Sequence, residues 1–234
     1  MDKLTPQEKI NLETFSNIYA VKETYNKEGF QGSEEYIVEK YFRKKGKILD
    51  LGCGTGRTTM PFKQRGFEVT GIDLSKEMID FARKKHEGID FRVMDACDLD
   101  FKDASFDYIF FSFNGIDYIH PYKKRIKCIN EARRVLKKGG LFVFSSHNAL
   151  CVPKNRELMK VFIRNLINLK LFTKYRMEVS PSGVICTYHG IPFIEKNNLE
   201  KMGFRVLEAV GRKYNKGFSM IFFEISPYYV AKKQ

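Results

Sequence analysis

Three glycines at alternate positions form the stretch with the clearest chemical meaning. Gly52, Gly54 and Gly56 follow directly on the apolar-rich residues 48–51, a run too short for a helix and typical of a buried strand. Glycine tolerates a positive φ and lets a ligand approach the backbone closely. Asp50 adds a carboxylate two residues before the first glycine. The stretch therefore predicts a strand that ends in a tight ligand-binding turn.

Phosphate is the usual ligand of such a turn, but the spacing here argues against it. The dinucleotide-binding pattern is G-x-G-x-x-G, and this chain has Arg57 where the pattern needs its third glycine. The Gly-Lys-Ser/Thr sequence that ends a P-loop does not follow. The Asp50 carboxylate would repel a diphosphate and attract an ammonium group. The turn therefore suits an adenine nucleoside with an amino-acid tail better than a nucleotide diphosphate.

The segments L-D-L-G-C-G-T-G-R and V-T-G-I-D-L-S resemble motifs I and II of class I S-adenosylmethionine (SAM)-dependent methyltransferases, and the resemblance covers residues 47–140. It implies a Rossmann-like fold, SAM as the cofactor and S-adenosylhomocysteine as the product. Asp73 ends the second predicted strand, about 20 positions beyond the glycines, where an acidic residue accepts hydrogen bonds from a ribose diol. A domain of this fold with a degenerate, empty site is the alternative.

The same resemblance implies further contacts to the cofactor. Asp95, after the third predicted strand, would lie beside the adenine amino group, and Asp98 is the competing choice. In this family an N-terminal segment folds over the cofactor, often with a tyrosine, and Tyr19 and Tyr25 are the two candidates. An aromatic face near the cationic sulfonium adds attraction. The predicted cofactor-binding set is Tyr19, Tyr25, Asp50, Gly52, Cys53, Gly54, Gly56, Arg57, Asp73, Leu74, Asp95, Ala96 and Phe113.

Predicted strands and helices alternate along most of the chain, which favours an α/β domain. The resemblance implies a doubly wound, mostly parallel seven-stranded sheet whose last strand is antiparallel, with N-terminal helices and an inserted helix-and-hairpin lid after the fifth strand. We expect residues 1–45 to form a helical cover, 46–150 the SAM-binding core, 151–192 the substrate lid, and 193–234 a helix and strand pair that complete the core.

Two boundaries in this scheme depend on local patterns. A helix over residues 122–138 is expected to stop at the glycine pair 139–140, because glycine ends helices readily. The closing antiparallel strands are predicted at residues 204–210 and 218–225, with residues 228–231 as an extension.

A general base would help the reaction if the acceptor is an amine or a hydroxyl. His147 follows the fifth predicted strand, at the edge of the sheet where ligands bind. Tyr188 and His189 lie on a predicted hairpin around residues 180–183. These three residues are the catalytic candidates, and a structural role is the alternative for each. The chain has no N/D-P-P-Y motif of the kind typical of enzymes that methylate base amines or glutamine.

The length of the chain fits one domain with a lid, or at most a domain and a small annex. The chain has 234 residues, of which 43% are hydrophobic, enough for a packed core. A polar N-terminus and the lack of any run near the roughly 18 apolar residues of a spanning helix predict a cytoplasmic protein. Five cysteines without a C-x-x-C pair support neither a disulfide framework nor a metal site.

The net charge of +13 raises the question of anionic partners, although lysine and arginine are spread along most of the chain. The leading hypothesis is a SAM-dependent methyltransferase that moves a methyl group by in-line displacement to O, N or C of a small molecule. One alternative is an RNA or protein methyltransferase. Another is an enzyme of membrane-associated quinone or lipid precursors, with the basic helix predicted at residues 155–172 resting on an anionic membrane. The last alternative is a domain that binds SAM but has no enzymatic activity.

Overall fold

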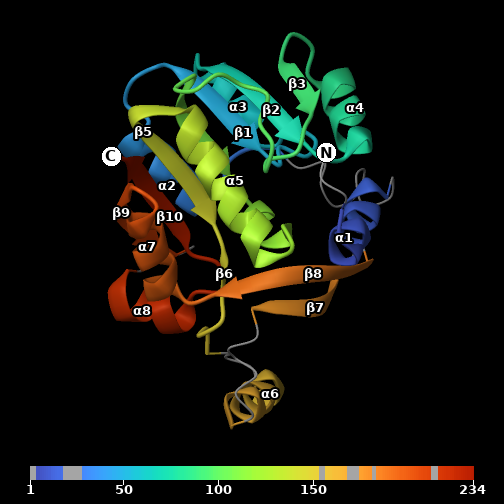
Figure 1. Ribbon diagram of the computed structural model, residues 1–234, viewed down its shortest axis with the longest axis vertical. Coiled ribbons are helices and arrows are strands. Elements are labelled where there is room, and N and C mark those ends of the chain that lie inside the picture. The colour runs from blue at the N-terminus through green and yellow to red at the C-terminus, as the bar shows by residue number, and fades with distance from the viewer. Residues whose placement is uncertain (1–3, 18–27, 153–155, 168–173, 181–182, 212–215) are drawn as a thin grey trace.

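The computed structural model describes residues 4–17, 28–152, 156–167, 174–180, 183–211 and 216–234. Seven strands form one sheet in the order β3-β2-β1-β4-β5-β10-β9 (Figure 1). These strands are β1 (Lys47–Leu51), β2 (Glu68–Asp73), β3 (Asp90–Val93), β4 (Phe106–Phe111), β5 (Leu136–Ser145), β9 (Phe204–Val210) and β10 (Tyr228–Lys233).

The direction of the strands confirms the predicted fold class. Strands β1 to β5 pair in parallel, whereas β10 pairs antiparallel with both β5 and β9. The chain order reverses at β1, which lies between β2 and β4. In an open α/β sheet, ligands bind beyond the carboxyl ends of the strands at this reversal. The glycine turn follows β1 and therefore begins at that point.

Two helices begin at residues whose side chains cap them. Thr5 caps α1 and forms a capping box with Glu8, and Ser75 caps α4 by accepting a hydrogen bond from the Met78 amide. The helices outside the inserted segment are α1 (Pro6–Ser16), α2 (Gly32–Tyr41), α3 (Thr59–Gln64), α4 (Lys76–Lys85), the 3-10 helix η2 (Gly115–Tyr118), α5 (Tyr122–Val135), α7 (Pro192–Lys201) and α8 (Gly217–Phe223). Within the described ranges, no helix combines the length and the apolar composition needed to cross a membrane.

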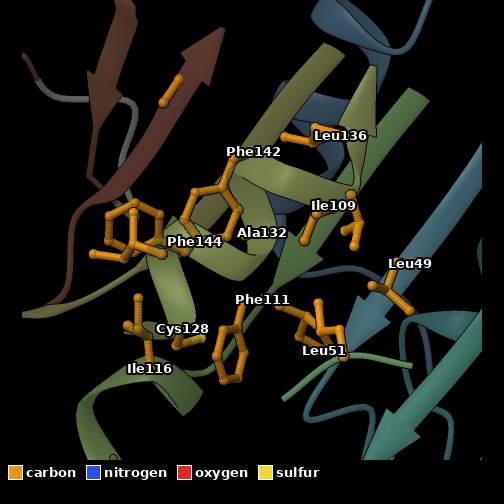
Figure 2. Packing of buried hydrophobic residues seen from close by; sticks show 14 of the residues in the cluster. Leu49, Leu51, Ile109, Phe111, Ile116, Cys128, Ala132, Leu136, Phe142 and Phe144 are labelled. Atoms are coloured by element: carbon orange, nitrogen blue, oxygen red, sulfur yellow. The ribbon is translucent and has the colours of Figure 1, made fainter. Parts of the chain in front are cut away.

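Apolar side chains fill both faces of the sheet. Figure 2 shows one face, where Phe111, Phe142 and Phe144 pack against Cys128 and Ala132 of α5. On the other face, a second cluster joins residues of the sheet to α2 and α3. The central strands are therefore buried on both sides, as the continuous apolar sequence of β4 predicts. This packing holds the strand ends that form the site in fixed positions.

The segment inserted after β5 forms a second, smaller sheet. Its elements are β6 (His147–Asn148), α6 (Arg156–Ile167), β7 (Tyr175–Ser180) and β8 (Gly183–Gly190), with the strand order β6-β8-β7. β7 and β8 pair antiparallel, so the predicted hairpin is confirmed. In Figure 1 this sheet lies below the main sheet, with β8 extending toward α1. A substrate-lid role for the insertion, and the four-part division of the chain, stay predictions.

Two predicted boundaries are wrong. Helix α5 ends at Val135, and β5 begins at Leu136, so the glycine pair 139–140 lies inside a strand rather than at a helix end. Residues 218–225 do not form a strand, because α8 occupies most of them and the sheet position is taken by β10. The apolar side chains of β10 are buried, whereas Phe218 is 72% exposed. The segment whose apolar side chains are better buried, β10, therefore forms the strand between β5 and β9.

Candidate functional site

A cavity of about 430 Å³ opens at the carboxyl ends of β1, β2 and β4. Three groups of residues line it: the glycine turn, the ends of neighbouring strands, and residues of α1 and η2. The lining is Glu8, Asn11, Leu12, Phe15, Gly52, Cys53, Gly54, Thr55, Arg57, Thr58, Ile72, Asp73, Leu74, Ser75, Met78, Met94, Asp95, Ala96, Phe111, Ser112, Phe113, Gly115, Tyr118 and Ile119. Its volume is within the range of small-molecule sites, roughly 300–1,000 Å³.

The turn after β1 has a backbone that requires glycine. Gly52 and Gly54 have φ of +58° and +55°, in the left-handed region that other residues adopt at a cost. A Cβ on Gly52 would also come within 2.8 Å of the Phe111 ring. The Cys53 amide donates to the Ile72 carbonyl at 2.9 Å and so ties the turn to β2. The turn therefore presents bare backbone to the cavity.

Asp73 lies in the cavity wall, at the end of β2. Its Oδ2 accepts a hydrogen bond from the Gly54 amide and its Oδ1 accepts one from the Ser75 amide, each at 2.9 Å. Burial raises the pKa of this carboxyl, and the backbone amide donors oppose that shift. Each carboxylate oxygen has two lone pairs, so acceptor capacity remains for a ligand hydroxyl. The carboxylate thus fixes the glycine turn and faces the cavity.

Asp95 and Asp98 differ in their relation to the cavity. Asp95 and Ala96 line it, and the Asp95 Oδ1 accepts a hydrogen bond from the Cys97 amide at 2.8 Å. Asp98 is exposed and is absent from the lining. Of the two carboxylates considered for the adenine end of a cofactor, the geometry favours Asp95.

Asp50 does not line the cavity, which differs from its predicted place. Its side chain is buried beneath the turn, where its Oδ2 accepts hydrogen bonds from the Thr58 hydroxyl at 2.8 Å and the Thr59 hydroxyl at 2.6 Å. Its Oδ1 is buried and has no hydrogen-bond partner among the described residues. Burial raises the pKa of the Asp50 carboxyl to about 6. The Asp50 carboxylate therefore makes no contact with the cavity, and only its charge could reach a ligand there.

Arg57 connects the glycine turn to α2. Its guanidinium donates to both carboxylate oxygens of Glu34, at 2.8 and 2.7 Å, and to the Ser112 hydroxyl at 2.8 Å. Burial by itself would raise the pKa of Glu34, but the Arg57 charge and hydrogen bonds lower it below its usual value. The Tyr228 hydroxyl also donates to Glu34, at 2.7 Å. This buried network holds the turn against the sheet.

Helix α1 covers the cavity, and the sequence did not reveal which of its residues would do so. Glu8, Asn11, Leu12 and Phe15 line the cavity. Asn11 donates to the backbone carbonyls of Tyr118 and Cys186 and accepts from the Cys186 amide, all within 3.0 Å. The predicted tyrosines, Tyr19 and Tyr25, lie outside the described residues. The family resemblance predicted a cover from the N-terminal segment but did not indicate these residues of α1.

Aromatic side chains form the wall between α1 and β4. Phe113 has φ +50° and its ring lies 4.3 Å from the Arg57 guanidinium carbon. Phe15 and Tyr118 meet edge to face with their ring centroids 4.7 Å apart. Phe113, Phe15 and Tyr118 all line the cavity, and of these the sequence predicted only Phe113. This half of the cavity is mostly apolar and aromatic, with Glu8 and Asn11 of α1 as polar members of its lining, while the half near Asp73 and Asp95 is polar.

His147 is not part of the cavity lining. Its Nδ1 lies 2.9 Å from the Asp117 carboxylate and its Nε2 lies 3.2 Å from the Asn114 amide nitrogen. The Asp117 carboxylate favours a proton on Nδ1, which leaves Nε2 as the acceptor for Asn114. Asn114 precedes η2 and Asp117 lies within it. Two other residues of η2, Gly115 and Tyr118, line the cavity. His147 is therefore one residue removed from the site.

Tyr188 and His189 are also outside the lining. Tyr188 is buried, donates to Glu195 at 2.7 Å, and stacks beneath the Arg125 guanidinium at 4.2 Å. The His189 Nε2 lies 2.9 Å from Glu178, and its ring stacks on His147 with centroids 5.0 Å apart. The structure brings the three catalytic candidates into one cluster beside the cavity. A direct catalytic role for them stays a prediction.

Comparisons with known proteins agree with this geometry. Residues 48–140 match the family model described as a methyltransferase domain. Over 120 residues the chain is 36% identical to YqeM of Bacillus subtilis, a protein with a methyltransferase name, and the match covers 50% of this chain and 49% of YqeM. It is 33% identical over 144 residues to the demethylmenaquinone methyltransferase of Staphylococcus aureus, covering 58% of each. The chain thus spans about half the length of these relatives.

A solved structure resembles more of the chain. The PH0226 protein of Pyrococcus horikoshii has a TM-score of 0.63 and 28% sequence identity, with 92% of this chain and 98% of that one covered. Together, the sheet order, the glycine turn and the family match identify residues 48–140 as a methyltransferase domain of the class I, SAM-dependent type. The predicted resemblance is confirmed.

Proposed function

We propose that this protein transfers a methyl group from SAM to O, N or C of a small molecule. One observation carries the proposal: a single cavity joins the glycine turn, Asp73 and Asp95 to an apolar, aromatic wall from α1 and η2. The polar half has the groups that recognise an adenosine, and we assign the acceptor to the aromatic half.

The residues present fit SAM. The bare backbone at Gly52 and Gly54 leaves space that any Cβ would narrow, and the Asp73 and Asp95 carboxylates can accept hydrogen bonds from ribose hydroxyls and the adenine amine. The Asp50 Oδ1, which has no hydrogen-bond partner in the described part of the chain, provides negative charge near the turn. A diphosphate would meet these carboxylates with repulsion, whereas a sulfonium and an ammonium group would be attracted.

The chain contributes alignment and exclusion of water. Bound SAM supplies a methyl group that its sulfonium already activates for displacement. The protein holds donor and acceptor in line, and good alignment can contribute about 7–11 kcal/mol to a reaction of this kind. The faces of Phe113 and Tyr118 can stabilise a cationic sulfur and methyl group. We propose these rings, on the aromatic wall, as the surroundings of the reacting atoms.

The cover that α1 forms over part of the cavity favours a small acceptor. Asn11 fastens α1 to η2 and β8, so α1 covers the cavity and a small molecule would be enclosed. A segment of RNA or protein would need an open face across which its chain could continue. The demethylmenaquinone methyltransferases among the relatives favour a second candidate, a membrane-associated quinone or lipid precursor. The aromatic wall suits such a ring system as well.

We expect labelled methyl groups from SAM to enter the small-molecule fraction of a cell extract. The purified protein would be incubated with methyl-labelled SAM and with separated small-molecule, lipid, RNA and protein fractions. Label in an organic-solvent extract would favour the quinone or lipid candidate. Label confined to RNA or protein would contradict the proposal, and label in no fraction would favour a binding domain without activity.

We expect His147→Ala to lower kcat roughly fivefold while the SAM affinity stays unchanged. The variant removes the imidazole nitrogen that accepts a hydrogen bond from Asn114. Asn114 has a φ of +57° and precedes η2, so its release should shift η2 slightly. Small misplacements of groups near the reacting atoms lower the reaction rate. The measurement is kcat, KM and their pH dependence with an acceptor found by labelling. A pH profile of unchanged shape would indicate positioning, whereas loss of its rising limb would indicate that His147 is the base. An unchanged kcat would show that His147 is neither a positioning residue nor the base.

A further inference from the structure

Helix α6 exposes a strip of aliphatic side chains next to a basic pair. Ile163, Leu166 and Ile167 are 48%, 49% and 75% exposed. Lys160 and Arg164 are exposed as well. At 100° per residue, the three aliphatic side chains share one side of the helix, and the basic residues stand one turn apart along its edge. Ile163, Ile167, Lys160 and Arg164 also line a shallow groove.

The position of α6 leaves this strip accessible. In Figure 1 α6 lies at one end of the long axis of the molecule, beyond β7 and β8 and away from the main sheet. The chain that leads into α6 is fastened to α8, because the Val152 amide donates to the Phe222 carbonyl at 2.7 Å. Helix α8 exposes Phe218 and Phe223, 72% and 50%, in the same half of the molecule. Helices α6 and α8 thus both carry exposed apolar side chains in this half of the molecule.

We propose that α6 docks on a lipid bilayer that contains anionic lipids. An amphipathic helix with aliphatic residues on one side and lysine or arginine at the edge lies in the bilayer interface, with the aliphatic side chains below the headgroups and the basic ones among them. Ile163, Leu166 and Ile167 would enter the bilayer, and Lys160 and Arg164 would meet the lipid phosphates. The net charge of +13 favours approach to such a surface.

Other occupants fit this strip less well. In a symmetric dimer the same surface faces itself, so Lys160 and Arg164 of both copies would lie near one another and repel. Nucleic acid would match the basic pair but would leave the aliphatic strip uncovered. An anionic bilayer matches both kinds of side chain. The inference goes beyond the proposed function and does not depend on it, because docking requires neither SAM nor an acceptor.

Vesicle co-sedimentation of the full chain tests this inference. We expect the protein to sediment with vesicles of phosphatidylcholine and phosphatidylglycerol and to stay in solution with phosphatidylcholine alone. The pair Ile163→Ser and Ile167→Ser, made together, should lower the bound fraction at least fivefold. Lys160→Glu with Arg164→Glu, a second variant that keeps the aliphatic strip, should lower it similarly and should remove its dependence on salt.

Controls separate a specific surface from general basicity. Lys63→Glu with Lys84→Glu makes the same charge change on exposed residues of α3 and α4, far from α6, and should leave binding near that of the wild type. Thermal unfolding and S-adenosylhomocysteine affinity should be unchanged in every variant. Equal binding to both vesicle types, or equal losses in the α6 and control charge variants, would overturn the proposal. Sedimentation velocity showing a dimer that the serine variant dissociates would overturn it in favour of a second copy.

Discussion

Asp73→Ala should weaken SAM binding about 100-fold. The Asp73 carboxylate lines the polar half of the cavity, where we propose that it accepts hydrogen bonds from the two ribose hydroxyls. Hydrogen bonds to a charged group contribute about 1.5–3 kcal/mol each. Loss of two such bonds, partly replaced by water, corresponds to about 3 kcal/mol, or roughly 100-fold in Kd. Isothermal titration calorimetry with SAM and with S-adenosylhomocysteine measures the change.

A structural effect of this substitution must be separated from the loss of ligand contacts. Asp73 also accepts the Gly54 and Ser75 amides, so alanine would free the turn and remove a contact at the start of α4. Asp73→Asn keeps one carbonyl oxygen and the side-chain shape and should lose less affinity. Asp98→Ala, at an exposed carboxylate outside the cavity, is the matched control and should bind normally. Normal affinity in Asp73→Ala would remove this residue from the site.

Gly54→Val tests the same site from the backbone side. A Cβ at Gly54 would have no heavy atom nearer than the Met78 sulfur at 4.0 Å, so the folded chain has room for it. The cost is the φ of +55°, which a β-branched residue adopts only with strain. We expect a similar loss of SAM affinity to that in Asp73→Ala with little change in the rest of the fold, because the strain is relieved by moving the turn.

The polar half of the cavity could be predicted from sequence because the relevant residues follow strands. Gly52, Asp73 and Asp95 each stand at the end of a short apolar run, and parallel strands bring their carboxyl ends to one edge. The apolar runs therefore located the strand ends, while the resemblance to class I methyltransferases implied the order of the sheet and the place of Asp95. Asp50 was predicted to contact the cofactor but is buried beneath the turn. Its position in the sequence indicates how near the turn it lies, but not the direction in which its side chain points.

The apolar half depends on contacts between distant parts of the chain. Helix α1 reaches the cavity because Asn11 bonds to Tyr118 and Cys186, and because Thr14 donates to the Val184 carbonyl at 2.8 Å. No local pattern specifies partners more than 100 residues away. For the same reason the sequence pointed to tyrosines further along the N-terminal segment and not to the residues of α1 that line the cavity.

The error at residues 218–225 has a related cause. That segment and β10 are both short apolar runs, and periodicity alone does not separate a buried strand from a helix of this length. Phe218 and Phe222, four residues apart, have ring centroids 4.6 Å apart, which is helical spacing. Tyr229 and Val230 are almost fully buried between β5 and β9. Only one of the two segments can pair with both β5 and β9, and in the structure that segment is β10.

SAM affinity should also rise with pH through the pKa of Asp50. Burial raises the pKa of this carboxyl to about 6, so in the free protein it gains its charge between about pH 5 and pH 7. The sulfonium and ammonium charges of SAM favour the ionised form and lower the pKa in the complex. The bound state therefore holds fewer protons than the free state, and affinity increases with pH until Asp50 is ionised in both. We expect a change of about tenfold in Kd between pH 5 and pH 7.

The same residue predicts an opposite trend in stability. Because the folded pKa lies above that of an unfolded aspartate, about 3.9, the folded protein without ligand loses stability as pH rises from about 4 to above 6. Asp50→Asn removes this loss, so its unfolding temperature should depend less on pH across that range. A buried charge that destabilises the free protein while favouring a cationic ligand is a known kind of compromise between stability and function.

Asp50→Asn should reduce the dependence of SAM affinity on pH between 5 and 7, with an affinity close to the weaker value that the wild type has at pH 5. Calorimetry in buffers of different ionisation enthalpy should detect proton release on binding to the wild type at pH 6 and none with Asp50→Asn. S-adenosylhomocysteine lacks the sulfonium charge and should show a smaller slope. His86 is a competing source, because it packs beneath Gly56 and burial lowers its pKa. A slope that persists in Asp50→Asn and disappears in His86→Gln would assign the effect to His86 and contradict the role of Asp50.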